Sequence, residues 1–128
     1  MQCEKLDVWR RSAALSADIY EHLADLKDFG FKDQLTRSGL SVPSNNAEGM
    51  ERVSKMEKQR FLDIARSSLA EARTQIYIGM KINYIENERG KQWIAESETI
   101  AKMLTGLINK IKTADCTPRT ANKPGNEQ

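Results

Sequence analysis

The stretch 41–54, SVPSNNAEGMERVS, lies near the middle of the chain and decides how its helices are connected. A proline, two adjacent asparagines and a glycine would ordinarily mark a loop. The apolar spacing nevertheless continues across Pro43, and the residue four positions earlier is Gly39, which leaves the backbone room to bend. This pattern predicts a kinked helix over 31–49 that ends at Gly49 in the left-handed conformation.

The polar side chains of this stretch are expected to serve the backbone. Asn45 and Asn46 follow Pro43, which leaves carbonyl groups without a helical partner, so their amides are predicted to satisfy the backbone there. Glu48 lies one turn before Arg52, which is the spacing of a favourable ion pair. A catalytic alternative makes Glu48 a buried general base. The structural interpretation is preferred because it gives these polar groups partners.

The next helix has a clear start signal, since Ser54 followed by Glu57 forms a capping box. Apolar residues at steps of three and four then predict a helix over 55–85, and the same periodicity predicts helices over 5–27 and 91–112. With short connections, the four predicted helices indicate an all-α, antiparallel up-down-up-down four-helix bundle.

The first predicted helix carries two apolar stripes. One comprises Leu6, Trp9, Ala13, Ala17, Tyr20 and Leu23 or Ala24, and the other comprises Val8, Leu15, Ile19 and Leu26. A surface helix needs only one stripe to reach the core of its own domain. Two stripes therefore predict burial on two sides, with one extra stripe besides the one that faces the core, as in an oligomer.

Composition limits the remaining classes of protein. The 128 residues suffice for one domain, predicted over 1–112, and the tail 113–128 has two prolines and no apolar periodicity, so it is predicted to be disordered. No stretch approaches the length of a membrane span. Cys3 and Cys116 lie near opposite ends and form no paired motif, which is typical of reduced thiols in the cytoplasm. The net charge of +2 excludes a histone-like polycation.

Candidate chemistry is sparse. The only histidine, His22, has Asp18 four residues before it, and a surface pair is the expected arrangement. A di-iron bundle would need a Glu-x-x-His motif on each of two helices, and a zinc quartet cannot be assembled from two distant cysteines. No phosphate-binding loop is present. We therefore expect no enzymatic activity, metal, cofactor, membrane or small-molecule substrate.

Basic residues are concentrated in the segment 52–73. The candidate nucleic-acid-binding residues are Arg52, Lys55, Lys58, Arg60, Arg66 and Arg73. Arg66 and Arg73 are seven positions apart and share one flank of their helix. Segregated positive charge is typical of a polyanion-binding face. The alternative is an ordinary solvated helix with mixed charges.

The segments VPSNNAEGMER and FLDIARSSLAEA resemble the bacterial four-helix-bundle proteins named after intervening sequences in 23S ribosomal RNA genes. The accessory variability proteins of diversity-generating retroelements are related to that family. The resemblance runs from about Leu6 to Lys112, and it implies a barrel-like homopentamer without catalytic activity. Relatives usually have an aliphatic residue where this chain has Asn46, and two basic residues where Arg37 stands alone.

Two functional hypotheses follow. The first is a non-enzymatic, homo-oligomeric bundle that binds structured RNA, or a reverse transcriptase–RNA complex, as an accessory factor. The second is a protein-only adaptor or scaffold ring that makes its contacts through apolar and acidic surface, including Asp18, Glu21 and Asp25.

Overall fold

A computed structural model describes the backbone of residues 3–116 and the side chains of residues 6–114. Within this part of the chain all regular structure is helical, in four helices: α1 (Cys3–His22), α2 (Phe29–Glu51), α3 (Lys55–Lys81) and α4 (Asn87–Cys116). The predicted all-helical class and the four-helix bundle are confirmed. None of the described helices is both long enough and apolar enough to cross a bilayer.

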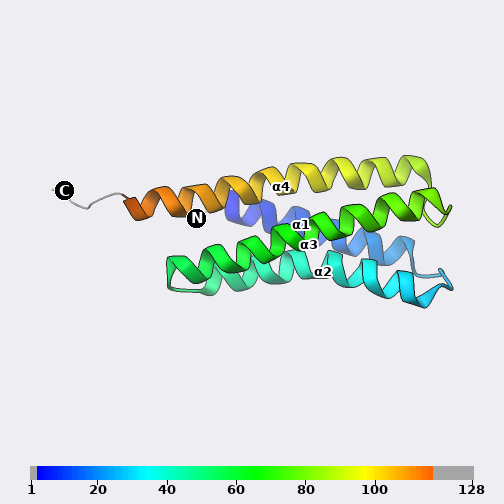
Figure 1. The fold of residues 1–128 in the computed structure, drawn as a ribbon, viewed down its shortest axis with the longest axis horizontal. Helices are drawn as coiled ribbons and strands as arrows, with labels where there is room; N and C mark the ends of the chain where they lie inside the picture. The colour runs from blue at the N-terminus through cyan, green and yellow to red at the C-terminus, as the bar shows by residue number, and fades with distance from the viewer. Residues whose placement is uncertain (1–2, 117–128) are drawn as a thin grey trace.

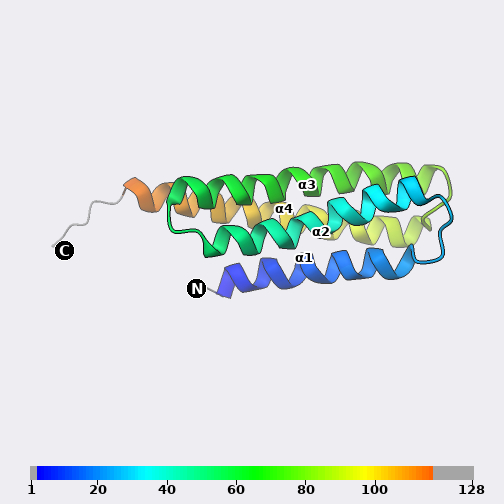
Figure 2. The ribbon, with the colours of Figure 1, turned by 90° about the horizontal axis from the view of Figure 1, so that it is seen from below.

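The helices are arranged so that α1 contacts α2 and α4, and α3 contacts the same two helices. Among the described residues no Cα atom of α1 comes within 8 Å of one in α3, so these two helices lie diagonally opposite each other. Figures 1 and 2 show the α1–α2 and α3–α4 connections at one end of the bundle. The α2–α3 connection lies at the other end.

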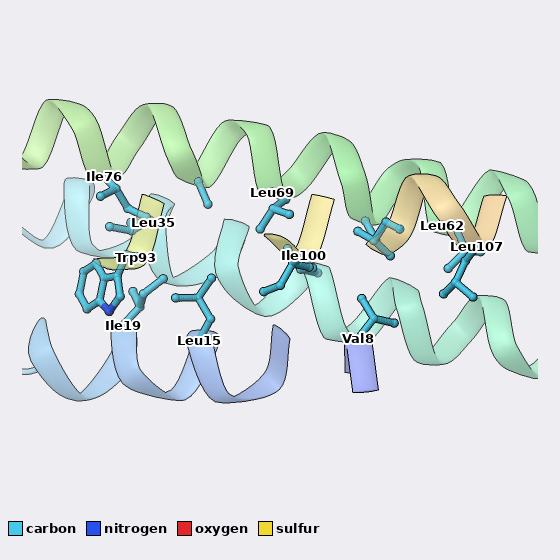
Figure 3. Packing of buried hydrophobic residues seen from close by; sticks show 14 of the residues in the cluster. Val8, Leu15, Ile19, Leu35, Leu62, Leu69, Ile76, Trp93, Ile100 and Leu107 are labelled. Carbon is cyan, nitrogen blue, oxygen red and sulfur yellow. The ribbon is translucent and has the colours of Figure 1, made fainter. Parts of the chain in front are cut away.

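One apolar core runs along the bundle between the four helices, and Figure 3 shows side chains from each helix pointing into it. On α1 the core residues are Val8, Leu15 and Ile19, which belong to the second of the two predicted stripes. Helices α3 and α4 each turn one side toward the core. Their buried members are Leu62, Ala65, Leu69, Ala72, Ile76, Gly79, Trp93, Ser97, Ile100, Leu104, Leu107 and Ile108.

The first connection is longer than predicted. Helix α1 ends at His22, five residues before the predicted end at 27. Helix α2 begins at Phe29 because Asp28 caps it, its Oδ1 accepting a hydrogen bond of 3.1 Å from the backbone N–H of Phe31.

Helices α3 and α4 also differ from prediction at their ends. Helix α3 ends at Lys81 rather than 85, and Asn83 adopts a φ of 64°, a left-handed conformation that asparagine tolerates. Helix α4 begins at Asn87, so part of the predicted turn is helical. The predicted disorder of 113–116 is wrong, since Thr113 Oγ1 bonds to the carbonyl of Asn109 at 2.8 Å within the helix. Residues 117–128 lie outside the described part of the chain.

A side-chain hydrogen bond joins the two connections at the α1–α2 end. The Tyr84 hydroxyl donates to Asp28 Oδ2 at 2.8 Å, and the Tyr84 ring packs edge-to-face on Phe31 at 5.2 Å between centroids. The backbone N–H of Phe31 and this hydroxyl lower the pKa of Asp28, and the same bond raises the pKa of Tyr84.

The predicted role of Gly49 is wrong. Helix α2 passes through Pro43 and Gly49 to Glu51, and no described glycine has positive φ. The backbone N–H of Arg52 closes the helix on the carbonyl of Gly49 at 3.2 Å. A Cβ at Gly49 would lie 3.3 Å from Phe61 Cβ, so the absence of a side chain at Gly49 allows α3 to pack close to α2. The predicted Ser54 cap is confirmed by the Glu57 N–H, 3.1 Å from Ser54 Oγ.

The two asparagines behave differently from each other. Asn45 Nδ2 donates to the carbonyl and the hydroxyl of Ser41, each at 2.9 Å. Asn45 therefore hydrogen-bonds to the backbone as predicted, and the carbonyl that it contacts is that of Ser41. Asn46 faces the core, and neither its Nδ2 nor its Oδ1 has a hydrogen-bond partner among the described residues. The prediction that Asn46 satisfies the backbone is therefore wrong.

Gly79→Ala is expected to lower the free energy of unfolding. An added Cβ would lie 2.6 Å from Ile85 Cδ1 and 2.9 Å from Phe31 Cζ, both in the packed end of the bundle. Overpacking of this kind costs about 1–2 kcal/mol. Urea unfolding measures the change. The control is Gly106→Ala, because a Cβ at Gly106 meets nothing within 4 Å and alanine favours a helix interior. A Gly79 variant as stable as the Gly106 variant would contradict this account.

Candidate functional site

The predicted basic residues divide into two groups in the structure. At the α2–α3 connection the Arg52 guanidinium forms an ion pair with Glu48, which confirms the predicted pairing. Arg52 also lies over the Phe61 ring at 5.0 Å, and Arg60 lies near the same ring at 5.5 Å. Phe61 is thus contacted by two guanidinium groups.

The lysines of this group lie on the first turns of α3. Lys58 Nζ is 3.5 Å from the carbonyl of Met50, near the C-terminus of α2, and Lys55 is half-buried. Between them Met56 is exposed, and Val53 is exposed in the connection. This end of the bundle therefore combines positive charge with exposed apolar side chains.

Arg66 and Arg73 form the second group, and both contact α4 from one flank of α3. Arg66 donates to Thr105 Oγ1 at 3.1 Å and pairs with Asp63 at 2.6 Å. Arg73 Nε donates to Ser97 Oγ at 2.9 Å. Both guanidinium groups thus connect α3 to α4. The binding of nucleic acid by the six predicted residues stays a prediction.

The acidic side of α1 packs against α4. Arg11 makes a bidentate contact with Glu96, at 2.8 and 2.9 Å, and the contact raises the pKa of Arg11 through hydrogen bonding and charge. Asp18 accepts a hydrogen bond of 2.7 Å from Trp93 Nε1. The predicted pairing of His22 with Asp18 is confirmed, since His22 Nδ1 lies 3.4 Å from Asp18 Oδ1; the same nitrogen donates to the Asp18 carbonyl at 2.9 Å.

The acidic residues on this side of α1 differ in their contacts and exposure. Asp18 is occupied by Trp93 and His22, whereas Glu21 and Asp25 are exposed. Within the described chain no three acidic, histidine or cysteine side chains are placed to hold a metal ion.

A groove lies on the surface between α1 and α2. It consists of two adjoining hollows of about 500 and 530 Å³ that share Tyr20 in their walls. The apolar residues that define this α1–α2 groove are Trp9, Ala13, Ala17, Tyr20, Phe29, Leu40, Pro43 and Ala47. The same hollows are also lined by Ser16, Ala24, Lys32, Asp33, Thr36 and Ser44.

Large apolar side chains line the groove and remain accessible to solvent. Tyr20 is 45% exposed, Leu40 47% and Phe29 69%. Small residues, including Ala13 and Ala47, also line the hollow of about 500 Å³. Such a contiguous apolar patch is typical of an interaction site.

The sequence indicated only half of this groove. Trp9, Ala13, Ala17 and Tyr20 belong to the extra stripe on the first helix, which predicted burial by another molecule. Phe29 and Leu40 were missed, although they recur with Pro43 and Ala47 on one side of α2. Testing that helix for a second stripe would have identified them.

Comparisons with known proteins identify the family. The family model described as 23S rRNA-intervening sequence protein matches residues 4–106. A search of curated proteins finds no match. One solved structure with the same fold is a protein of unknown function from the S23 ribosomal protein family of Bacteroides thetaiotaomicron. It is 24% identical, with a TM-score of 0.78 over 83% of this chain and 98% of that one. Since the family model spans most of the bundle, the chain belongs to the 23S rRNA-intervening sequence protein family.

Proposed function

We propose that the chain is a non-catalytic scaffold that associates with copies of itself through the α1–α2 groove. The observation that carries the proposal is the row of accessible apolar side chains in the groove, including Tyr20, Phe29 and Leu40. A partner that covered this row would stabilise the complex by about 25 cal/mol for each Å² of apolar surface removed from water. Aromatic residues are also enriched at protein–protein interfaces.

The assembly that we propose is a barrel of five antiparallel four-helix bundles, as the family resemblance implies. Native mass spectrometry and sedimentation velocity over a range of concentrations test it, because each added subunit contributes 14.5 kDa. A single mass near five subunits supports the proposal. A monomer at all concentrations up to the millimolar range contradicts it.

A second candidate function is binding of structured RNA, alone or with a reverse transcriptase. The observation that favours it is the arrangement of Arg52 and Arg60 about Phe61, with Lys58 three positions before Phe61 on α3. A symmetric assembly would repeat this cluster in every subunit. Phosphate contacts of this kind give affinity with little base preference.

The double variant Lys58→Glu/Arg60→Glu is expected to weaken binding to a labelled RNA hairpin and to flatten its salt dependence. Each lost phosphate contact lowers the slope of log affinity against log salt by roughly 0.7–0.9. The matched control is Lys91→Glu/Lys102→Glu, which reverses two exposed charges on α4. Equal losses in the two variants, or none, would exclude this cluster as the RNA site.

A further inference from the structure

The outward side of α3 is a second accessible apolar surface, separate from the groove. Ile78 is 45% exposed and Ile82 47% exposed, and Ile64 lies on the same side near the start of the helix. We define the α3 face by Ile64, Glu71, Ile78, Lys81 and Ile82. Figure 2 shows α3 along one edge of the bundle and α1 along the opposite edge. The α3 face and the α1–α2 groove therefore lie on different sides of the molecule.

The two surfaces have complementary shapes. The groove is a hollow between two neighbouring helices, whereas the α3 face is the outer side of one helix, on which only Glu71 borders a smaller hollow of about 250 Å³ beside α2. Two grooves placed against each other would leave their hollows unfilled. A single helix with apolar residues at spacings of three and four fits a groove between two others.

The charges beside the two surfaces also match in spacing and order. Arg10 and Glu21 are exposed on α1, and Glu71 and Lys81 are exposed on α3. Glu21 lines the neighbouring hollow between α1 and α4, which meets the groove at Ala17. At 1.5 Å per residue the first pair is roughly 16 Å apart along its helix and the second roughly 15 Å. The order is positive then negative on α1, and negative then positive on α3. None of these four side chains has an ion-pair partner among the described residues; Lys81 lies over the Tyr77 ring.

We infer that the α1–α2 groove of one subunit receives the α3 face of a second copy, which deepens the proposed function and rests on it. The two helices run in the same direction, so that Glu71 meets Arg10 and Lys81 meets Glu21 across the contact. Ile78 and Ile82 then lie against the part of the groove around Tyr20. Because the two surfaces differ, the contact is heterologous, and repeated contacts close into a ring when the rotation between subunits permits.

Complementation between two blocked variants tests this inference. The groove variant is Tyr20→Glu/Leu40→Glu, and the face variant is Ile78→Glu/Ile82→Glu. Each variant alone is expected to be a folded monomer, which circular dichroism and native mass spectrometry establish together. Mixed in equal amounts, they are expected to form a dimer with one copy of each. The intact face of the groove variant docks in the intact groove of the face variant, and no further subunit can add.

The other outcomes overturn the inference in distinguishable ways. A face variant that assembles like the wild type means that the groove binds something other than the α3 face, and the proposed self-association survives. Two monomeric variants that fail to form the mixed dimer also overturn it. A wild-type chain that is itself monomeric overturns both the inference and the proposed function.

A charge exchange tests the orientation independently of the apolar substitutions. Arg10→Glu and Glu71→Arg are each expected to weaken assembly by about fivefold, because each places like charges opposite one another. The double variant Arg10→Glu/Glu71→Arg is expected to recover the wild-type concentration dependence. Failure of the double variant to recover, with both single variants weakened, overturns the parallel orientation.

Discussion

Replacing Tyr20 and Leu40 by glutamate is expected to convert the assembled protein into a folded monomer. Both side chains are nearly half exposed in the isolated chain, at 45% and 47%, so charged replacements there cost the bundle little. In an assembly the same positions would be covered. A buried carboxylate without a partner is then strongly unfavourable. Sedimentation velocity reports the mass, and circular dichroism reports the retained helix.

The control for this prediction adds the same charge elsewhere. Ala95 and Asn109 are exposed on α4, outside both the groove and the α3 face, so Ala95→Glu/Asn109→Glu is expected to keep the wild-type mass. Dissociation of the control variant would show that net charge, rather than the groove, governs assembly. An assembled groove variant would show that the groove is not the interface.

Replacing Asn46 by leucine is expected to raise the free energy of unfolding by about 1–3 kcal/mol, the usual cost of leaving buried polar groups unsatisfied. Asn46 is 0% exposed, and both polar atoms of its amide lack hydrogen-bond partners among the described residues. Leucine has the same number of side-chain heavy atoms and no polar group. Urea unfolding of wild type and variant at equal protein concentration measures the difference.

The neighbouring asparagine provides a matched control. Asn45 Nδ2 bonds to the Ser41 carbonyl, so Asn45→Leu is expected to lower the free energy of unfolding by about 1 kcal/mol. The two substitutions are chemically identical and lie one position apart, yet they should differ in sign. A destabilised Asn46→Leu protein would mean that the amide makes interactions that stabilise the core.

The sequence predicted the bundle well because periodicity reports which side of a helix is buried. Trp93, Ile100 and Leu69 occupy the core positions that their spacing indicated. Helix ends were less predictable, since they depend on local contacts. The cap at Asp28 and the left-handed Asn83 each moved a boundary. Gly49 was misjudged because a glycine can serve a turn or a close helix contact, and only the position of Phe61 distinguishes them.

The candidate sites depend on side-chain contacts that sequence patterns do not predict. Positive charge in a segment gives no information on how each side chain is used. Arg66 and Arg73 contact hydroxyl groups of α4, and Arg52 pairs with Glu48. The extra stripe on α1 indicated an apolar surface that the bundle's own core does not cover. The periodicity of α1 alone could not show that α2 forms the other wall of the groove.

The most direct test of the proposed association is hydroxyl-radical footprinting of the assembled wild-type protein, with the groove variant measured alongside. The chain has two tryptophans, Trp9 in the groove and Trp93 in the core, so Trp93 serves as an internal reference. The account predicts that Trp9 is protected in the wild type nearly as well as Trp93, and is oxidised readily in the monomeric groove variant. Equal oxidation of Trp9 in both proteins would contradict it.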